Sequence, residues 1–206
     1  MDLKFGDFAG DYREVKTNRS ELRRASARCV RRRSHTPKMK TIVSILALLT
    51  TPLVATAELY YNQEFKFSLD APTGWTVKKS AQPNTVIKFV YRDANARIAV
   101  LSIAAYPDTP GALTADGMFA TFKDEYRDFT YRRLDSGSTK IRSMEAVWNL
   151  IEITDPPQAR IIGKHYHFVR NGKIWRVSAM TDSGKDFFAT VLPIMDKAIS
   201  TIAFGL

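Results

Sequence analysis

Alternating apolar and polar positions predict a series of strands along much of the chain. Residues 65–69 (FKFSL) alternate in the manner of a half-buried strand, and the turn-forming residues 70–74 follow. Residues 86–91 and 97–106 predict two further strands, and the second is apolar on both faces. A strand of that kind is expected in a sheet that is covered on both sides.

The apolar period changes to that of a helix in two places. Residues 113–127 carry one apolar stripe at helical spacing, and Thr114 suits the N-cap position. Residues 183–202 carry a longer stripe, with Ser183 as the predicted cap and Pro193 inside the helix, where we expect a kink. Two amphipathic helices are therefore predicted.

Strands resume between the two helices, at residues 130–141 and 145–154, and are followed by a hairpin over residues 159–181. The pair Asn171-Gly172 favours a two-residue type I′ turn, which fixes the register of the hairpin. The resulting cross-strand pairs are Phe168 with Trp175, Tyr166 with Val177, His167 with Arg176 and His165 with Ser178. We expect the aromatic face to be buried and the histidine face to contact water.

The order of these elements predicts an α+β fold. Strands, a helix, more strands and a closing helix suit a mainly antiparallel sheet, and strands that are apolar on both faces need a helical layer on each side. The predicted architecture is a three-layer α/β/α sandwich with a mainly antiparallel central sheet.

Residues 39–57 are predicted to form a secretory signal peptide that begins at the internal Met39. Lys38 and Lys40 flank its start, an apolar run follows, and Ala55-Thr56-Ala57 forms a small-x-small cleavage site before Glu58. A retained membrane anchor is disfavoured because threonines and a proline interrupt the run, and no cysteine follows it to carry a lipid. We therefore expect a periplasmic or secreted protein with no transmembrane anchor after cleavage.

The segments on either side of this signal differ in character. Residues 1–38 are polar and rich in arginine. We interpret them as the result of a start codon assigned too far upstream, with Met39 as the true initiator, or as a disordered extension. The alternative is a twin-arginine export signal at Arg32-Arg33. Residues 58–206 have the usual size of one domain and are predicted to form a single mature domain.

The charge and the cysteine content of the chain argue against several classes of function. The whole chain carries a net charge of +10, but residues 1–57 hold 12 basic and 5 acidic side chains, which leaves only +3 after cleavage. Nucleic-acid binding therefore loses its main support. The only cysteine is Cys29, so the predicted mature domain can contain no disulfide and no thiol nucleophile.

Taken together, the chain resembles the Mog/PsbP-like α/β/α sandwich proteins, which include the lumenal PsbP proteins of photosystem II and many exported bacterial proteins. The resemblance rests on the opening FKFSLDAPTGW (residues 65–75), the mid-chain helix, the hairpin that ends in Trp175, and the closing FFATVLPIMDKAISTIAF (residues 187–204). It covers nearly all of residues 58–206. It implies a binding or assembly role more often than an enzymatic one, without a shared site to transfer.

His165 and His167 form the one candidate for metal binding, because residues two apart on a strand point the same way. The predicted register places Arg176 opposite His167, and a fixed cation there opposes a divalent metal. We therefore expect no metal and no cofactor, and we keep His165, His167 and Arg176 as candidate binding residues on a solvent-facing strand.

Basic and aromatic residues also alternate over residues 126–133 (YRDFTYRR). We expect the aromatic side chains to point inward and Arg132 and Arg133 to contact a protein or an anionic lipid. The carboxylates nearby, Glu125 among them, are predicted to lie on a solvated helix face rather than to form a catalytic pair. No hydrolase motif is present, so no enzyme activity is predicted.

The sequence thus favours an exported, non-catalytic binding or assembly module of the bacterial cell envelope that acts through protein contacts, with an envelope protein as its partner. The first alternative is a carrier of a small apolar molecule or lipid, with a pocket between sheet and helix. The second is a metal-dependent enzyme centred on His165 and His167.

Overall fold

The computed structural model describes residues 57–82, 84–107, 113–127, 129–155, 159–182 and 184–205. Most of the predicted signal peptide, including Ala55, lies outside the described residues, as does the predicted cap Ser183. The compact unit that carries these elements spans Thr56–Leu206.

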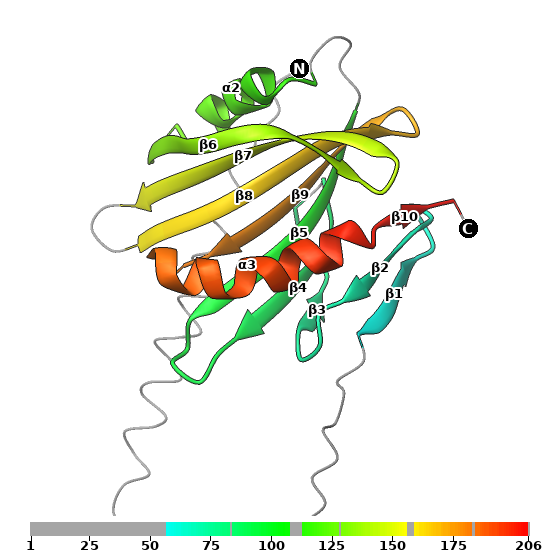
Figure 1. The fold of residues 1–206 in the computed structure, drawn as a ribbon, viewed down its shortest axis with the longest axis horizontal. Coiled ribbons are helices and arrows are strands. Elements are labelled where there is room, and N and C mark those ends of the chain that lie inside the picture. Colours follow the sequence, from blue (N-terminus) through cyan, green and yellow to red (C-terminus); the bar gives the residue numbers. More distant parts are fainter. Residues whose placement is uncertain are drawn as a thin grey trace, which may run out of the picture. The chain divides into compact units, whose positions relative to one another are not determined.

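A seven-stranded antiparallel sheet forms the centre of this unit (Figure 1). Its strands, in spatial order, are β3 (Thr76–Lys78), β4 (Thr85–Arg92), β5 (Ile98–Pro107), β9 (Lys173–Thr181), β8 (Ala159–Arg170), β7 (Met144–Asp155) and β6 (Thr130–Ile141). The hairpin of β8 and β9 has the predicted register, including His165 opposite Ser178 and Phe168 opposite Trp175. Asn171 and Gly172 have φ values of 52° and 64°, as a type I′ turn requires.

A second, three-stranded sheet was not expected from the sequence. It consists of β1 (Glu58–Asn62), β2 (Phe67–Ala71) and β10 (Ala203–Phe204), in the order β1-β2-β10. The strand predicted from residue 65 therefore begins two residues later, because Lys66 has a left-handed φ of 50° and belongs to the preceding turn.

Two helices are described, α2 (Ala115–Glu125) and α3 (Gly184–Ser200). Thr114 caps α2 as predicted, since its hydroxyl accepts a hydrogen bond of 3.0 Å from the backbone N–H of Gly117. Pro193 lies inside α3. None of the helices among the described residues has the length and apolar character needed to cross a membrane.

The helices cover opposite faces of the large sheet. In β9, Trp175, Val177 and Ala179 share one hydrophobic core with the buried face of α3. Arg176 lies between them in sequence, points to the other face, and contacts Glu125 at the end of α2. Figure 1 shows α3 crossing the strands of the sheet and α2 beyond β6. The three-layer α+β architecture is thus as predicted.

The small sheet closes the core on the α3 side. The Trp175 ring lies in this core. Its centroid is 5.6 Å from that of the Phe67 ring of β2 and 4.6 Å from that of the Phe204 ring of β10. Trp175 is 1% exposed and Phe67 is also 1% exposed. Apolar side chains therefore fill the space between the large sheet, the small sheet and α3.

Candidate functional site

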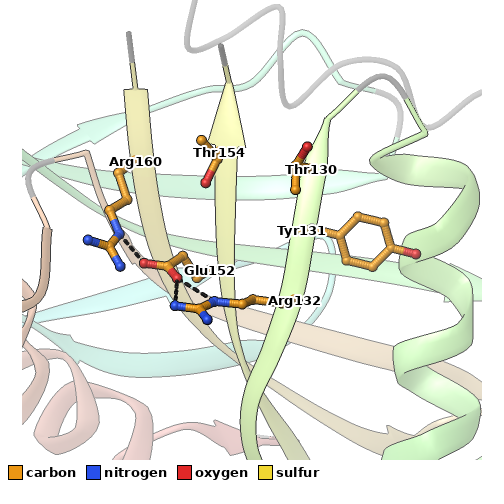
Figure 2. A pocket seen from close by; sticks show the side chains of 6 residues that line it. All are labelled: Thr130, Tyr131, Arg132, Glu152, Thr154 and Arg160. Carbon is orange, nitrogen blue, oxygen red and sulfur yellow. Dashed lines mark hydrogen bonds and ion pairs between the residues drawn. The ribbon is translucent and has the colours of Figure 1, made fainter. Parts of the chain in front are cut away.

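A solvent-open groove of about 380 Å³ lies where β6, β7 and β8 run side by side. It is lined by Thr130, Tyr131, Arg132, Glu152, Thr154 and Arg160. Figure 2 shows Arg160, Glu152 and Arg132 on three neighbouring strands, with the carboxylate between the two guanidinium groups. The ring of Tyr131 points away from them, towards α2.

Glu152 is the centre of this groove and is almost fully buried, with 4% of its side chain exposed. Arg132 donates to its Oε2 from both Nε, at 2.7 Å, and Nη2, at 2.6 Å. Arg160 donates to Oε1 through Nε. The arginine side chains remain 64% and 51% exposed, so the buried carboxylate holds two solvent-accessible guanidinium groups in fixed positions.

The charged groups of the groove shift one another's pKa values. The hydrogen bond from Arg160 is the main cause of a lowered pKa at Glu152; burial acts in the opposite direction, and Arg132 adds to the lowering. The Glu152 carboxylate in turn raises the pKa of Arg160. Two guanidinium groups and one carboxylate give the groove a net charge of one positive unit.

Arg132 and Arg133 are neighbours in β6, directly before a β-bulge between Arg133 and Asp135, and their side chains point to opposite faces of the sheet. Arg132 pairs with Glu152 on the groove side, whereas the next residue, Arg133, points to the α2 side. There the Arg133 guanidinium lies 2.6 Å from Asp116 of α2 and stacks over the Phe119 ring. The two arginines that the sequence groups together thus contact different layers.

The other candidate residues gather beneath α2. His165 and His167 are 1% and 3% exposed, and both pack against the Phe122 ring, with centroid separations of 4.9 and 6.0 Å. The expectation of a solvent-facing histidine strand is therefore wrong, because α2 covers this part of the sheet. Glu125 is also buried, 8% exposed, and not solvated as predicted. Its carboxylate lies 2.5 Å from the guanidinium of Arg176.

This buried cluster is polar but closely packed. The Nδ1 atom of His165 lies 2.9 Å from the Ser178 hydroxyl, whereas Nε2 of His165 and Nδ1 of His167 have no hydrogen-bond partner among the described residues. Burial, with Arg176 nearby, lowers the pKa of His167 to about 3 and that of His165 well below its usual value. Both imidazoles are therefore neutral at physiological pH.

No group of three or more potential metal ligands occurs among the residues that the structure describes. The carboxylate of Glu125, at the end of α2, is bound to Arg176. The cluster thus joins a helix to a sheet through an ion pair.

Sequence reasoning missed Glu152 and Arg160, which build the groove with Arg132. The signal for Glu152 was present: it is a lone carboxylate in the otherwise apolar run LIEI of β7. A carboxylate in such a strand is buried and needs a partner. Arg160 precedes the apolar part of the next strand and supplies that partner.

The fold matches several solved structures at low sequence identity. The cyanobacterial PsbP protein (CyanoP) of Synechocystis is 16% identical, with a TM-score of 0.51, over 78% of this chain and 99% of that one. The Saccharomyces cerevisiae Ran-binding protein Mog1p is 5% identical, with a TM-score of 0.52, over 73% and 96%. A Pseudomonas aeruginosa protein described as a putative regulator is 14% identical, with a TM-score of 0.50, over 73% and 99%.

No protein-family model matches this sequence, and no curated protein sequence matches it. At these identities the structural matches establish the fold alone, as the resemblance implied.

Proposed function

Because the described part of this chain has the PsbP/Mog1-like fold, we propose that the protein is an exported, non-catalytic binding or assembly module of the bacterial cell envelope that acts through protein contacts. The predicted signal peptide at residues 39–57 supports the envelope location. Among proteins of similar fold, Mog1p is described as Ran-binding, which supports a role in protein contacts for this scaffold.

The observation that carries the proposal is the pair of guanidinium groups held at the surface by buried Glu152. Arginine is enriched at protein interfaces, and a preorganised guanidinium loses little conformational freedom when a partner binds. The polar groups described in the groove are arginines, threonines and a tyrosine around one carboxylate that two arginines already hold. Such a set suits recognition and lacks a free general base.

The test is capture of the partner in cells. The full chain, with a tag joined through a flexible linker after Leu206, is expressed behind its own signal, cross-linked lightly, purified and examined by mass spectrometry. The groove variant is Arg132→Gln with Arg160→Gln. The matched control is Arg170→Gln with Lys173→Gln, which removes the same charge from exposed positions at the other end of β8 and the start of β9.

We expect the same one or two envelope proteins with the wild type and the control, and their loss with the groove variant. Recovery of the protein alone in every case would contradict a role in protein contacts. Native mass spectrometry of that sample would then show whether a lipid or small apolar molecule is bound instead, as the carrier alternative requires.

A further inference from the structure

As far as the described residues show, part of each guanidinium group in the groove is available to a ligand. Arg132 contacts Glu152 through Nε and Nη2, and Arg160 contacts it through Nε. An arginine carries five N–H donors, so Nη1 of Arg132 and both terminal nitrogens of Arg160 take no part in holding Glu152. These donors belong to side chains that are more than half exposed.

The charge and shape of these donors define the ligand. Glu152 cancels one of the two positive charges, so the groove complements a single negative charge. A carboxylate is planar and accepts two parallel N–H bonds, the geometry that a guanidinium fork matches. The exposed side chains of Thr130 and Thr154 add hydroxyl groups to the lining. We propose that the groove is a carboxylate-binding site that takes an aspartate or glutamate side chain of the partner protein.

A protein carboxylate fits this groove better than a membrane surface does. Recognition of anionic lipid headgroups relies on clusters of about four to eight basic residues. The groove has only two arginines among its lining residues, and Glu152 offsets one of their two positive charges. It also lies beside β6, the terminal strand of the sheet in the described part of the chain, so an extended segment of a partner can approach it from the side.

This inference rests on the proposed function, and it assigns Glu152 as a positioning residue. The buried carboxylate brings two like-charged groups together and fixes their orientation, which separate arginines on a sheet surface would not retain. A carboxylate held by this fork should therefore bind more tightly than one attracted by two lysines at the same positions.

The test uses the full chain labelled with ¹⁵N and follows the arginine Nε–Hε resonances by NMR. The probe is the peptide acetyl-Ala-Glu-Ala-amide, and its glutamine counterpart is the control ligand. We expect saturable shifts at Arg132 and Arg160 with the glutamate peptide, in the millimolar range, and none with the glutamine peptide. The variant Arg160→Gln should weaken binding about tenfold, whereas Arg170→Gln with Lys173→Gln should leave it unchanged.

A second variant separates the guanidinium fork from simple charge attraction. Arg132→Lys with Arg160→Lys keeps the charge and should weaken binding about threefold to tenfold. The backbone spectrum of each variant shows whether the fold is retained. Equal shifts with both peptides, unchanged binding in the folded lysine variant, or tighter binding of inorganic phosphate or of phosphatidylglycerol vesicles would overturn the carboxylate assignment.

The two proposals fail separately. If cross-linking captures a partner through the groove but the glutamate peptide has no advantage, the carboxylate inference is wrong and the proposed function stands. If the peptide binds as expected but no protein is captured, the groove binds carboxylates, and both the role in protein contacts and the assignment of a partner's side chain are wrong.

Discussion

The Arg176 guanidinium of β9 lies 2.5 Å from the Glu125 carboxylate of α2, and this ion pair joins the helix to the middle of the sheet. Only 13% of the Arg176 side chain and 3% of the Glu125 side chain are exposed. Burial alone would lower the pKa of Arg176, but the Glu125 carboxylate and the phenols of Tyr106 and Tyr126 raise it. The charge of Arg176 inside the protein is therefore stabilised by the Glu125 carboxylate beside it.

Removing one partner of this pair should cost much more than removing both. Glu125→Gln leaves the Arg176 charge buried without its counter-ion, and we expect a loss of about 3–5 kcal/mol in the free energy of unfolding, measured in urea. The matched control is Glu125→Leu with Arg176→Met, which replaces the pair by apolar groups and should cost less. A double variant that is less stable than Glu125→Gln would contradict this account.

The buried histidines should make the protein acid-sensitive. Their folded-state pKa values are lowered, to about 3 for His167, while the unfolded chain has the ordinary value of 6.5. Between these values the unfolded state binds more protons, so stability is fully present above pH 6.5 and is lost as the pH falls towards 3. The slope should approach about 1.4 kcal/mol per pH unit for each histidine.

Urea unfolding between pH 7 and pH 4 measures this dependence. His167→Gln removes one titrating group, and its slope over this range should be smaller than that of the wild type. Identical slopes for the two proteins would show that His167 does not contribute.

Gly163 should not tolerate a side chain. A Cβ atom at this position would lie 2.8 Å from Nε2 of His165 and 2.8 Å from Cγ of Met180. The His165 ring is held by Ser178, so it cannot move aside freely, and Gly163→Ala should lower the unfolding free energy by about 1–3 kcal/mol. Ser143→Ala, at an exposed turn, is the control and should change it by less than about 0.5 kcal/mol. Equal unfolding free energies for Gly163→Ala and the wild type would contradict this prediction, because they would mean that the sheet accommodates the extra methyl group without loss of stability.

The predicted processing site makes a further prediction. If the signal is cleaved after Ala57, the protein isolated from the cell envelope should begin at Glu58, which is also the first residue of β1. Ala55→Leu should block cleavage and leave the precursor, because a large side chain replaces the small residue that the site requires. Intact mass measurement distinguishes these forms, and Thr56→Ser is the control that should be processed normally.

The parts of the fold that sequence analysis predicted correctly depend on local interactions. The turn at Asn171-Gly172 determines the register of β8 and β9 without help from the rest of the chain. The helix cap at Thr114 likewise depends on a contact three residues away. Such features can be derived from a single sequence because the responsible atoms lie close together along the chain.

The environment of the candidate residues could not be derived in this way. His165 is buried because Phe122, from a helix far earlier in the sequence, packs on it. The hairpin pattern alone indicates two faces but does not show which segment covers each of them. The separation of Arg132 from Arg133 follows from the alternation of side chains along β6, but the sequence does not show that Glu152 and Arg160 of the neighbouring strands meet Arg132. The resulting groove is therefore a product of long-range packing.

The position of β10 affects how the core of this chain can form. Phe204 packs against Trp175 and Phe168, and β10 pairs with β2, which lies near the start of the compact unit. The core therefore lacks one of its aromatic walls until β10 has paired with β2. The small sheet thus joins segments that are far apart in the sequence, and this part of the core can close only after the chain has brought the two distant ends of the unit together.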